Sequence, residues 1–275
     1  MAAVRVLVNG APADTLSVAD RGVAYGDGLF ETIRFVHGLA PLWARHQQRL
    51  QDGCRRLGIP APDAEQCLRE AAAVSAGWDH AVVRITLTRG VGPRGYAPPA
   101  SPQPTRIVAA FEAPAMHGDS YLQGIRVRWC ETRLGLQPLL AGMKHLNRLE
   151  QVLARAEWSE AAIPEGLLLD LDGNVISATM ANLFAVIDGT LVTPSVERCG
   201  VAGVARAEVL SARPDAQVTT LRPDQLQHAR EVFLTSGVRG ILPVQAVGDT
   251  VYGPGPVTRA MQRHWCGLGF PMEQA

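Results

Sequence analysis

Short runs of β-branched and aromatic residues alternate with amphipathic stretches along this 275-residue chain, and that order restricts it to folds that combine sheets with helices. Val4–Val8 alternates before an Asn9-Gly10 turn, so we expect a strand that enters a hairpin. Further strands are predicted at residues 30–36, 81–88 and 106–111, and helices at residues 42–57 and 63–74. The first part of the chain therefore predicts an α/β domain.

Residues 112–124 show neither the helical nor the strand spacing of apolar residues. We place a linker there, between an N-terminal domain of residues 1–111 and a C-terminal domain of residues 125–275. In the second domain Asp172-Gly173-Asn174 and Asp188-Gly189 are predicted hairpin turns. Strands are predicted at residues 125–130, 166–171, near 218, 232–235 and 241–247, and helices at residues 147–161, 204–212 and 256–266. This order indicates two α/β domains of the α+β type.

Charge and hydropathy exclude several classes of protein. The 26 basic and 26 acidic residues cancel, which excludes a nucleic-acid-binding protein that depends on a basic surface. No stretch approaches the roughly 20 apolar residues of a membrane helix, and Met1–Gly10 lacks the pattern of a secretory signal. The five cysteines form no CxxC pair. We therefore expect a cytoplasmic protein with reduced thiols.

Lys144 is the only lysine of the chain, against 25 arginines. Arginine can replace lysine as a positive charge, but its guanidinium stays protonated and forms no useful imine. A lysine amine can lose its proton through burial or neighbouring cations and then condense with a carbonyl. Lys144 is therefore a candidate nucleophile, and the alternative is an incidental surface lysine.

Gly90, Gly92 and Gly95 form a GxGxxG pattern after a predicted strand. A dinucleotide site needs a helix directly after these glycines, and the prolines at positions 98, 99, 102 and 104 exclude one. We interpret Arg89–Tyr96 as a tight loop that presents Arg94 and Tyr96, and a purely structural turn is the alternative. The sequence also has no HExxH or GxSxG pattern, so we expect neither a metal site nor a serine hydrolase.

Two small-residue corners predict an anion site. Gly200 and Gly203 precede a predicted helix and would leave the backbone amides of Val204 and Ala205 available to a phosphate. Thr235-Ser236-Gly237 follows a predicted strand and could add a hydroxyl and further amides.

One side chain of the predicted helix at residues 42–57 could complete the site. Arg49 could bind a phosphomonoester with paired hydrogen bonds, whereas we interpret His46, one turn earlier, as an interior histidine. A reactive lysine together with a phosphate site matches the requirements of pyridoxal 5′-phosphate.

Four motifs carry a resemblance to a known family, in order and spacing over nearly the whole chain. They are Tyr25-Gly26-Asp27-Gly28-Leu29-Phe30-Glu31-Thr32, His46-Gln47-Gln48-Arg49-Leu50, Lys144-His145-Leu146-Asn147-Arg148-Leu149-Glu150 and Ala181-Asn182-Leu183-Phe184. With them the chain resembles the class IV, or fold type IV, pyridoxal-phosphate-dependent aminotransferases. The resemblance implies a smaller N-terminal and a larger C-terminal domain with the cofactor between them, and a homodimer that completes the pocket.

The resemblance also assigns roles to individual residues. Lys144 matches the lysine that forms a Schiff base with the cofactor. The phosphate-binding positions match Arg49, Val204, Ala205, Ser236 and Gly237. Arg94 and Tyr96 match a loop that recognises substrate carboxylates, and Tyr25 and Phe30 match positions of the pocket wall.

Ser177 departs from the family pattern. The family has a glutamate at the matching cofactor-binding position, where it keeps the pyridine nitrogen protonated, and this chain has Ser177 five residues before Asn182. A neutral hydroxyl should stabilise a full carbanion less well than a carboxylate. We therefore expect Ser177 to disfavour transamination more than elimination, and the alternative is a tolerated variant without consequence.

The stretch that begins at Lys144 is most similar to the lyase members of the family. This similarity implies a folate-pathway lyase that converts 4-amino-4-deoxychorismate into p-aminobenzoate and pyruvate. Two alternatives stay open at this point. One is a D-amino-acid or branched-chain aminotransferase of the same fold, and the other is a non-catalytic binding protein for a small molecule.

Overall fold

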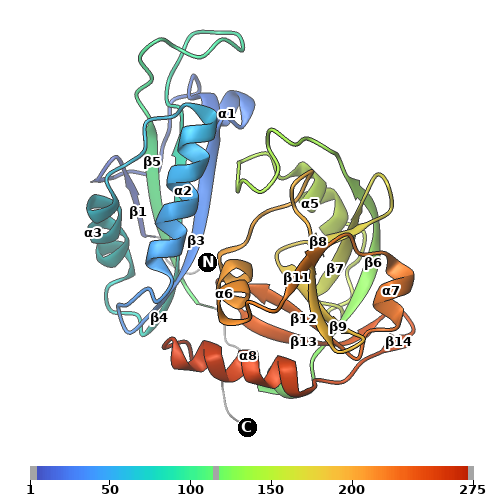
Figure 1. Cartoon of the computed structure of the whole chain (residues 1–275). Coiled ribbons are helices and arrows are strands. Elements are labelled where there is room, and N and C mark those ends of the chain that lie inside the picture. Colours follow the sequence, from blue (N-terminus) through green and yellow to red (C-terminus); the bar gives the residue numbers. More distant parts are fainter. Residues whose placement is uncertain (1–4, 114–117, 272–275) are drawn as a thin grey trace. The chain divides into compact units, whose positions relative to one another are not determined.

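A computed structural model describes residues 5–113 and 118–271 (Figure 1). The chain divides into two compact units. The first unit comprises Met1–Pro114 and Met143–Asn147, and the second comprises Ala115–Gly142 and Arg148–Ala275. In sequence order the segment Met143–Asn147 falls within the predicted C-terminal domain of residues 125–275. The predicted linker at residues 112–124 includes residues 114–117, which lie outside the described residues.

The first unit is built on an antiparallel sheet with the strand order β2-β1-β5-β4-β3. Its strands are β1 (Arg5–Val8), β2 (Ala11–Pro12), β3 (Gly28–Val36), β4 (His80–Thr88) and β5 (Thr105–Glu112). Its helices are α1 (Arg21–Tyr25), α2 (Trp43–Leu57) and α3 (Ala64–Ser75). Both α2 and α3 cover one face of the sheet (Figure 1). The predicted strands and helices of this half are confirmed to within two residues, although Val4 itself lies outside the described residues.

The two faces of β3 have different surroundings because side chains alternate along a strand. Ile33 and Phe35 belong to the apolar core of the first unit, together with Ala71 and Val74 of α3. Glu31 points to the same side, where it contacts α2. Phe30 therefore lies on the opposite face of the sheet.

The second unit is built on a nine-stranded mixed sheet with the order β11-β10-β9-β12-β13-β6-β7-β8, and β14 pairs with β13. Its strands are β6 (Ile125–Leu134), β7 (Glu165–Asp170), β8 (Val175–Ala178), β9 (Asn182–Ile187), β10 (Thr190–Pro194), β11 (Gln217–Thr219), β12 (Glu231–Ser236), β13 (Gly240–Val247) and β14 (Thr250–Val251). Its helices are α4 (Gly118–Leu122), α5 (Leu149–Arg155), α6 (Val204–Ala212), α7 (Pro223–Gln227) and α8 (Pro256–Gly267).

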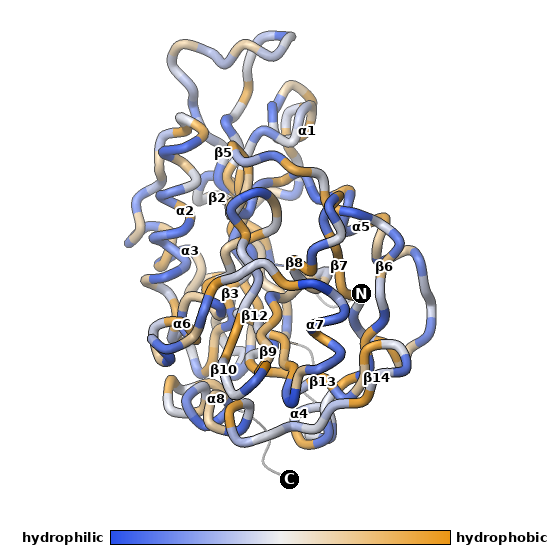
Figure 2. The backbone as a smooth tube through the Cα atoms, turned by 45° about the vertical axis from the view of Figure 1, so that its right-hand side comes forward, coloured by the Kyte–Doolittle hydropathy of each residue, from blue (hydrophilic) through white to orange (hydrophobic). Residues whose placement is uncertain are grey.

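The central strands of the second unit are buried along nearly their whole length. Leu183, Phe184 and Phe233 are completely covered, and the two phenylalanine rings stack at 5.3 Å. In Figure 2 these strands are largely orange, whereas α2 and α7 carry much blue. Continuous apolar runs of this kind are typical of strands covered on both faces.

Two local predictions differ from the structure. Helix α5 ends at Arg155 rather than residue 161, because Arg155 bonds the Trp158 carbonyl and Glu157 accepts hydrogen bonds from the Thr132 amide and its neighbour in β6. Helix α4 lies inside the stretch predicted as a linker. The Asp188-Gly189 hairpin turn is confirmed, since both residues have positive φ angles of 49° and 79°.

No helix among the described residues is long and apolar enough to cross a membrane.

Candidate functional site

Lys144 is held beside β3 by backbone pairing. The Phe30 amide donates to the Lys144 carbonyl at 2.9 Å, and the Leu146 amide donates to the Gly28 carbonyl at 3.0 Å. The segment Met143–Asn147 therefore extends the edge of the first sheet, although it is far from β3 in sequence. The half-buried ammonium nitrogen of Lys144 lies 4.4 Å from the centroid of the Phe30 ring. Two residues that the sequence predicted for the site are thus brought together.

Arg84 adds a second cation beside the Phe30 ring. Its guanidinium carbon lies 4.0 Å from the ring centroid, and its Nε donates to Thr86. Burial lowers the pKa of Arg84 below its usual value of 12.5. Two cations against one aromatic ring create a positive potential that favours an anionic ligand.

On the other face of β3, Glu31 binds two side chains of α2. Its carboxylate accepts from Arg49 Nε at 2.8 Å and from Arg49 Nη2 at 2.5 Å, and its Oε2 lies 2.6 Å from His46 Nδ1. Glu31 is 1% exposed and His46 is 2% exposed, which confirms His46 as an interior histidine. The paired bonds fix the plane of the Arg49 guanidinium.

The charges of the cluster formed by Glu31, His46 and Arg49 follow from its burial together with its ion pair and hydrogen bonds. Burial alone would raise the pKa of Glu31, but the charge of Arg49 and the hydrogen bonds from His46 and Arg49 lower it to about 2. Burial, assisted by the nearby charges of Arg49 and Lys144, lowers the pKa of His46 in spite of its bond to Glu31. At neutral pH the cluster is therefore an ion pair with a neutral histidine that donates from Nδ1.

In the second unit the predicted amides lie at the start of α6. Gly203 is the N-cap and has no side chain to cap the helix, and Val204 and Ala205 form its first turn. The Gly203 amide donates to Asn182 Oδ1 at 3.1 Å, and Asn182 Nδ2 donates to the Val201 carbonyl at 2.9 Å. Asn182 therefore fixes the loop that leads into α6, where free N–H groups favour an anion.

The second predicted corner converges on the first through the same asparagine. Thr235 of β12 is the register partner of Asn182. The Thr235 hydroxyl is buried and has no hydrogen-bond partner among the described residues, and Ser236 and Gly237 follow it at the end of the strand. A buried hydroxyl without a partner beside a helix N-terminus fits a phosphate group, which would accept from both.

Ser177 lies on β8, where it pairs with Leu168 of β7 and is 8% exposed. Within the part of the chain that the structure describes, no hydrogen bond joins it to either corner. Glu165 of β7 is a buried carboxylate, but it accepts from the Thr179 amide and hydroxyl and pairs with Arg239. The role of Ser177 therefore stays a prediction from the sequence.

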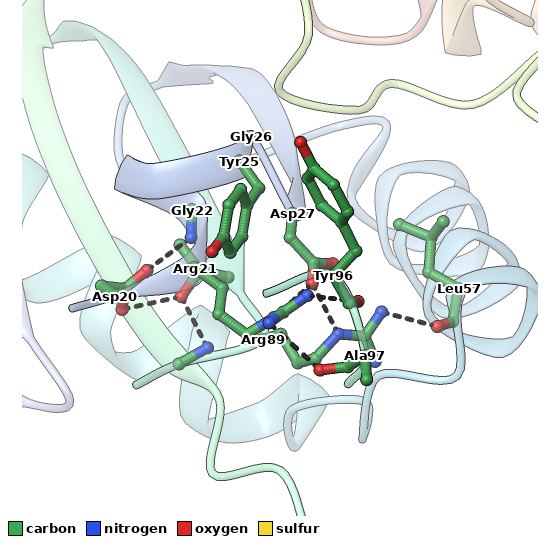
Figure 3. A network of polar contacts seen from close by, with 12 residues as sticks. Asp20, Arg21, Gly22, Tyr25, Gly26, Asp27, Leu57, Arg89, Tyr96 and Ala97 are labelled. Atoms are coloured by element: carbon green, nitrogen blue, oxygen red, sulfur yellow. Dashed lines mark hydrogen bonds and ion pairs between the residues drawn. The ribbon is translucent and has the colours of Figure 1, made fainter. Parts of the chain in front are cut away.

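Three of the four residues proposed to contact a substrate, Tyr25, Arg94 and Tyr96, lie at or against the β4–β5 loop, and Figure 3 shows Tyr25 and Tyr96 side by side. The Tyr25 hydroxyl accepts from the Gly95 amide at 2.9 Å, and its ring centroid lies 5.4 Å from that of Tyr96. Arg94 and Tyr96 are exposed, and Tyr96 retains 86% of its accessible surface. The sequence-predicted residues therefore form two sets, one in each unit. The first unit holds Lys144, Arg49, Phe30, Tyr25, Arg94 and Tyr96, and the second holds Ser177, Val204, Ala205, Ser236 and Gly237.

Sequence reasoning missed four residues of these sets. Glu31, Asn182 and Thr235 stand inside or next to motifs that the sequence singled out, and strand alternation could have placed Glu31 opposite to Phe30. Arg84 had no such signal, because it is one of many arginines and only the strand register brings it to the Phe30 ring.

Comparisons with known proteins identify the family of this chain. Residues 28–247 match the model of the family described as amino-transferase class IV. The chain is 38% identical over 244 residues to the aminodeoxychorismate lyase of Vibrio harveyi, covering 87% of this chain and 90% of that protein. The crystal structure of 4-amino-4-deoxychorismate lyase from Pseudomonas aeruginosa matches with a TM-score of 0.91 and 47% identity, covering 95% of this chain and 98% of that chain.

A more distant relative carries a form of the cofactor. The branched-chain amino acid aminotransferase of T.th., solved with pyridoxamine 5′-phosphate, matches with a TM-score of 0.81 and 26% identity, covering 97% of this chain and 93% of that chain. Together, a family model that spans residues 28–247 and a lysine anchored beside β3 establish that the chain belongs to the class IV amino-transferase family.

Proposed function

We propose that this protein is a pyridoxal 5′-phosphate-dependent lyase that converts 4-amino-4-deoxychorismate into p-aminobenzoate and pyruvate. The observation that carries the proposal is the position of its only lysine, which is half-buried and lies against the Phe30 ring that Arg84 also contacts. The chain is also 47% identical to a solved 4-amino-4-deoxychorismate lyase. Lysine condenses with a carbonyl through its neutral amine, a reaction that arginine cannot perform.

The residues of the two sets would hold the cofactor in different ways. Lys144 would bind its aldehyde carbon through the side-chain amine. The amides of Val204 and Ala205, the hydroxyls of Thr235 and Ser236, and Arg49 would bind its phosphate. When bound, pyridoxal 5′-phosphate supplies a sink for the electrons released at the carbon that bears the substrate amine.

Lys144 would also move the proton of the reaction. With the substrate bound, the Lys144 amine would accept the proton from the carbon that bears the substrate amine. The bond to the enolpyruvyl oxygen then breaks, and the ring becomes aromatic. The proton on Lys144 can pass to the departing enolpyruvate, which becomes pyruvate, so the amine is regenerated.

The test is release of p-aminobenzoate from 4-amino-4-deoxychorismate by the cofactor-loaded protein, with no keto acid present. We expect p-aminobenzoate and pyruvate in equal amounts. Activity only with an amino-acid and keto-acid pair would indicate an aminotransferase, and inactivity in both assays would indicate a binding protein. Lys144→Arg is the matched control, because it keeps the positive charge and removes the reactive amine.

Ser177 would favour this lyase reaction over transamination. A hydroxyl in place of a carboxylate stabilises a long-lived carbanion less well, and elimination does not require a proton to return to the cofactor carbon. Ser177→Glu should raise the rate of transamination relative to that of p-aminobenzoate release. An unchanged ratio of the two rates would contradict this role.

We propose that the protein acts as a homodimer in the cytoplasm. The outer side of α5 exposes Leu149, Val152 and Leu153 to 75%, 61% and 62%, and three apolar side chains at this spacing form a stripe suited to a second copy. Light scattering should give twice the mass of 29.5 kDa, and Leu153→Glu should lower the measured mass.

Reduced thiols suit the proposed location in the cytoplasm. Burial raises the pKa of Cys54 and Cys67 to about 11, which keeps these thiols protonated and unreactive.

A further inference from the structure

The loop between β4 and β5 is locked at its base. Its two ends, Thr88 and Thr105, are register partners, and both hydroxyls donate to the buried carboxylate of Asp20, at 3.0 and 2.7 Å. Just inside the loop, a Cβ on Gly90 would lie only 1.7 Å from the Gln103 carbonyl oxygen. The two strands of the loop therefore leave the sheet in close backbone contact.

A single buried arginine holds the tip of this loop (Figure 3). Arg21 is 3% exposed, and its guanidinium donates to three consecutive backbone carbonyls. Nη1 bonds to Gly95 at 2.9 Å and to Ala97 at 3.3 Å, and Nη2 bonds to Tyr96 at 3.0 Å. Because a guanidinium is planar and rigid, these bonds define the path of the backbone at the tip.

Asp27 fixes the orientation of this guanidinium. Its Oδ2 accepts from Arg21 Nε at 2.9 Å and from Arg89 Nε at 2.7 Å. Burial alone would raise the pKa of Asp27, but the hydrogen bonds and charges of Arg89 and Arg21 lower it. Arg89 in turn donates to the carbonyls of Leu57 and Gly58 at the C-terminal end of α2. The tip is thus anchored to the body of the first unit.

The backbone of the tip is held by hydrogen bonds, whereas two of its side chains are exposed. The Tyr25 hydroxyl accepts a hydrogen bond from the Gly95 amide, and the Arg21 guanidinium carbon lies 4.9 Å from the centroid of the Tyr25 ring. Arg94 and Tyr96 are exposed to solvent. The arrangement suits the presentation of two side chains to a ligand.

We propose that Arg21 is a positioning residue that determines substrate affinity by holding Arg94 and Tyr96 in place for a carboxylate of the substrate. The proposal rests on the lyase function for the identity of that substrate. Fixing the loop in advance removes the entropy that binding would otherwise cost. Loss of Arg21 should therefore raise KM and change kcat little, since Lys144 and its surroundings are untouched.

The first experiment measures the loop directly and needs neither cofactor nor substrate. Trypsin cleaves after arginine, so the rate of cutting at the Arg94–Gly95 bond reports on opening of the tip. In Arg21→Lys this rate, followed by mass spectrometry, should rise about tenfold or more, because lysine cannot bind three carbonyls in a plane. Arg126→Lys, at an exposed position of β6, is the matched control and should leave it unchanged. An unchanged rate in Arg21→Lys would overturn the proposal.

The second experiment separates affinity from chemistry. For Arg21→Lys with 4-amino-4-deoxychorismate we expect KM to rise about tenfold, with kcat within about threefold and cofactor affinity unaltered. In an Arg94→Gln background, Arg21→Lys should add much less, because it acts through the side chain already removed. The positioning role would be overturned if Arg21→Lys lowered kcat and cofactor affinity as much as it raised KM. It would also be overturned if the effects of Arg21→Lys and Arg94→Gln on KM were fully additive.

A milder variant guards against misfolding. Tyr25→Phe removes only the hydroxyl that accepts from Gly95, and we expect the same two effects at a smaller size. If no variant changes the cleavage rate, the proposal fails whatever the activity. If the wild-type protein releases no p-aminobenzoate, the lyase function fails, and the cleavage rate still decides whether Arg21 holds the loop.

Discussion

Two of the buried clusters of arginine and carboxylate in the first unit have different roles. Glu31 pairs with Arg49 and His46 and so fixes a side chain that we propose binds a phosphate. Asp27 pairs with Arg21 and Arg89, whose remaining donors bind backbone carbonyls. In the first cluster the carboxylate takes two donors of one arginine, whereas in the second it shares its arginines with the main chain.

This difference predicts how the clusters respond to loss of the carboxylate. An arginine that has lost the carboxylate paired with it in a buried site is an uncompensated charge. An arginine that still binds several carbonyls keeps part of its stabilisation. The Glu31 cluster should therefore be the more sensitive of the two, and three measurements test this order. A fourth tests the loop that the Asp27 cluster anchors.

Glu31→Ala should have the largest effect. Removing the carboxylate leaves Arg49 and His46 without their shared partner, so the free energy of unfolding should fall by about 3–5 kcal/mol. Urea unfolding followed by circular dichroism measures it. Glu65→Ala is the control, because Glu65 is 88% exposed and its pair with Arg69 spans 3.7 Å. A loss no larger than that of the control would show that the Glu31 cluster does not stabilise the fold.

The pH dependence of stability should reveal the same carboxylate. The pKa of Glu31 falls from 4.5 to about 2 on folding, so its contribution is complete above pH 4.5 and is lost as the pH falls through about 2. The difference corresponds to about 3 kcal/mol. The stability gap between wild type and Glu31→Gln, measured by urea unfolding, should therefore narrow by about that amount between roughly pH 5 and pH 2. A gap that stays constant over this range would refute the assignment.

Asp27→Asn should cost less than Glu31→Ala. Arg21 and Arg89 retain their bonds to the carbonyls of Tyr96 and Leu57 after the change, so we expect about 1–3 kcal/mol. The same unfolding assay measures it. A loss equal to that of Glu31→Ala would remove the distinction between the two clusters.

Gly95→Ala should have the smallest effect on stability. Gly95 has a φ angle of 103°, which alanine adopts only with strain, but a Cβ there would meet no atom within 4 Å. We expect a loss of about 1 kcal/mol, because strain is the whole cost. Gly90→Ala should cost clearly more, since its Cβ would collide with the Gln103 backbone. Thermal unfolding of both variants compares them, and equal losses would contradict the close approach at the base of the loop.

Much of the fold follows from local sequence, because its signals act within a few residues. The Asp188-Gly189 pair specifies a hairpin turn, and Gly203 before Val204 marks the start of α6, whose predicted bounds agree with the structure. The end of α5 could not be predicted from local sequence, because Glu157 accepts hydrogen bonds from backbone amides of β6 in place of continuing the helix. No local pattern contains that competing bond.

The same distinction between local sequence and tertiary structure applies to the candidate site residues. The residues alone provided Lys144 as the candidate nucleophile and the motifs that carry the resemblance to the family. Only tertiary structure decided that Lys144 lies against Phe30, that Glu31 holds Arg49, and that Arg21 carries the tip of a loop more than seventy residues away. The physical reason is that chemical identity belongs to a single residue. Proximity depends on strand register and helix docking, which join segments that the sequence keeps far apart.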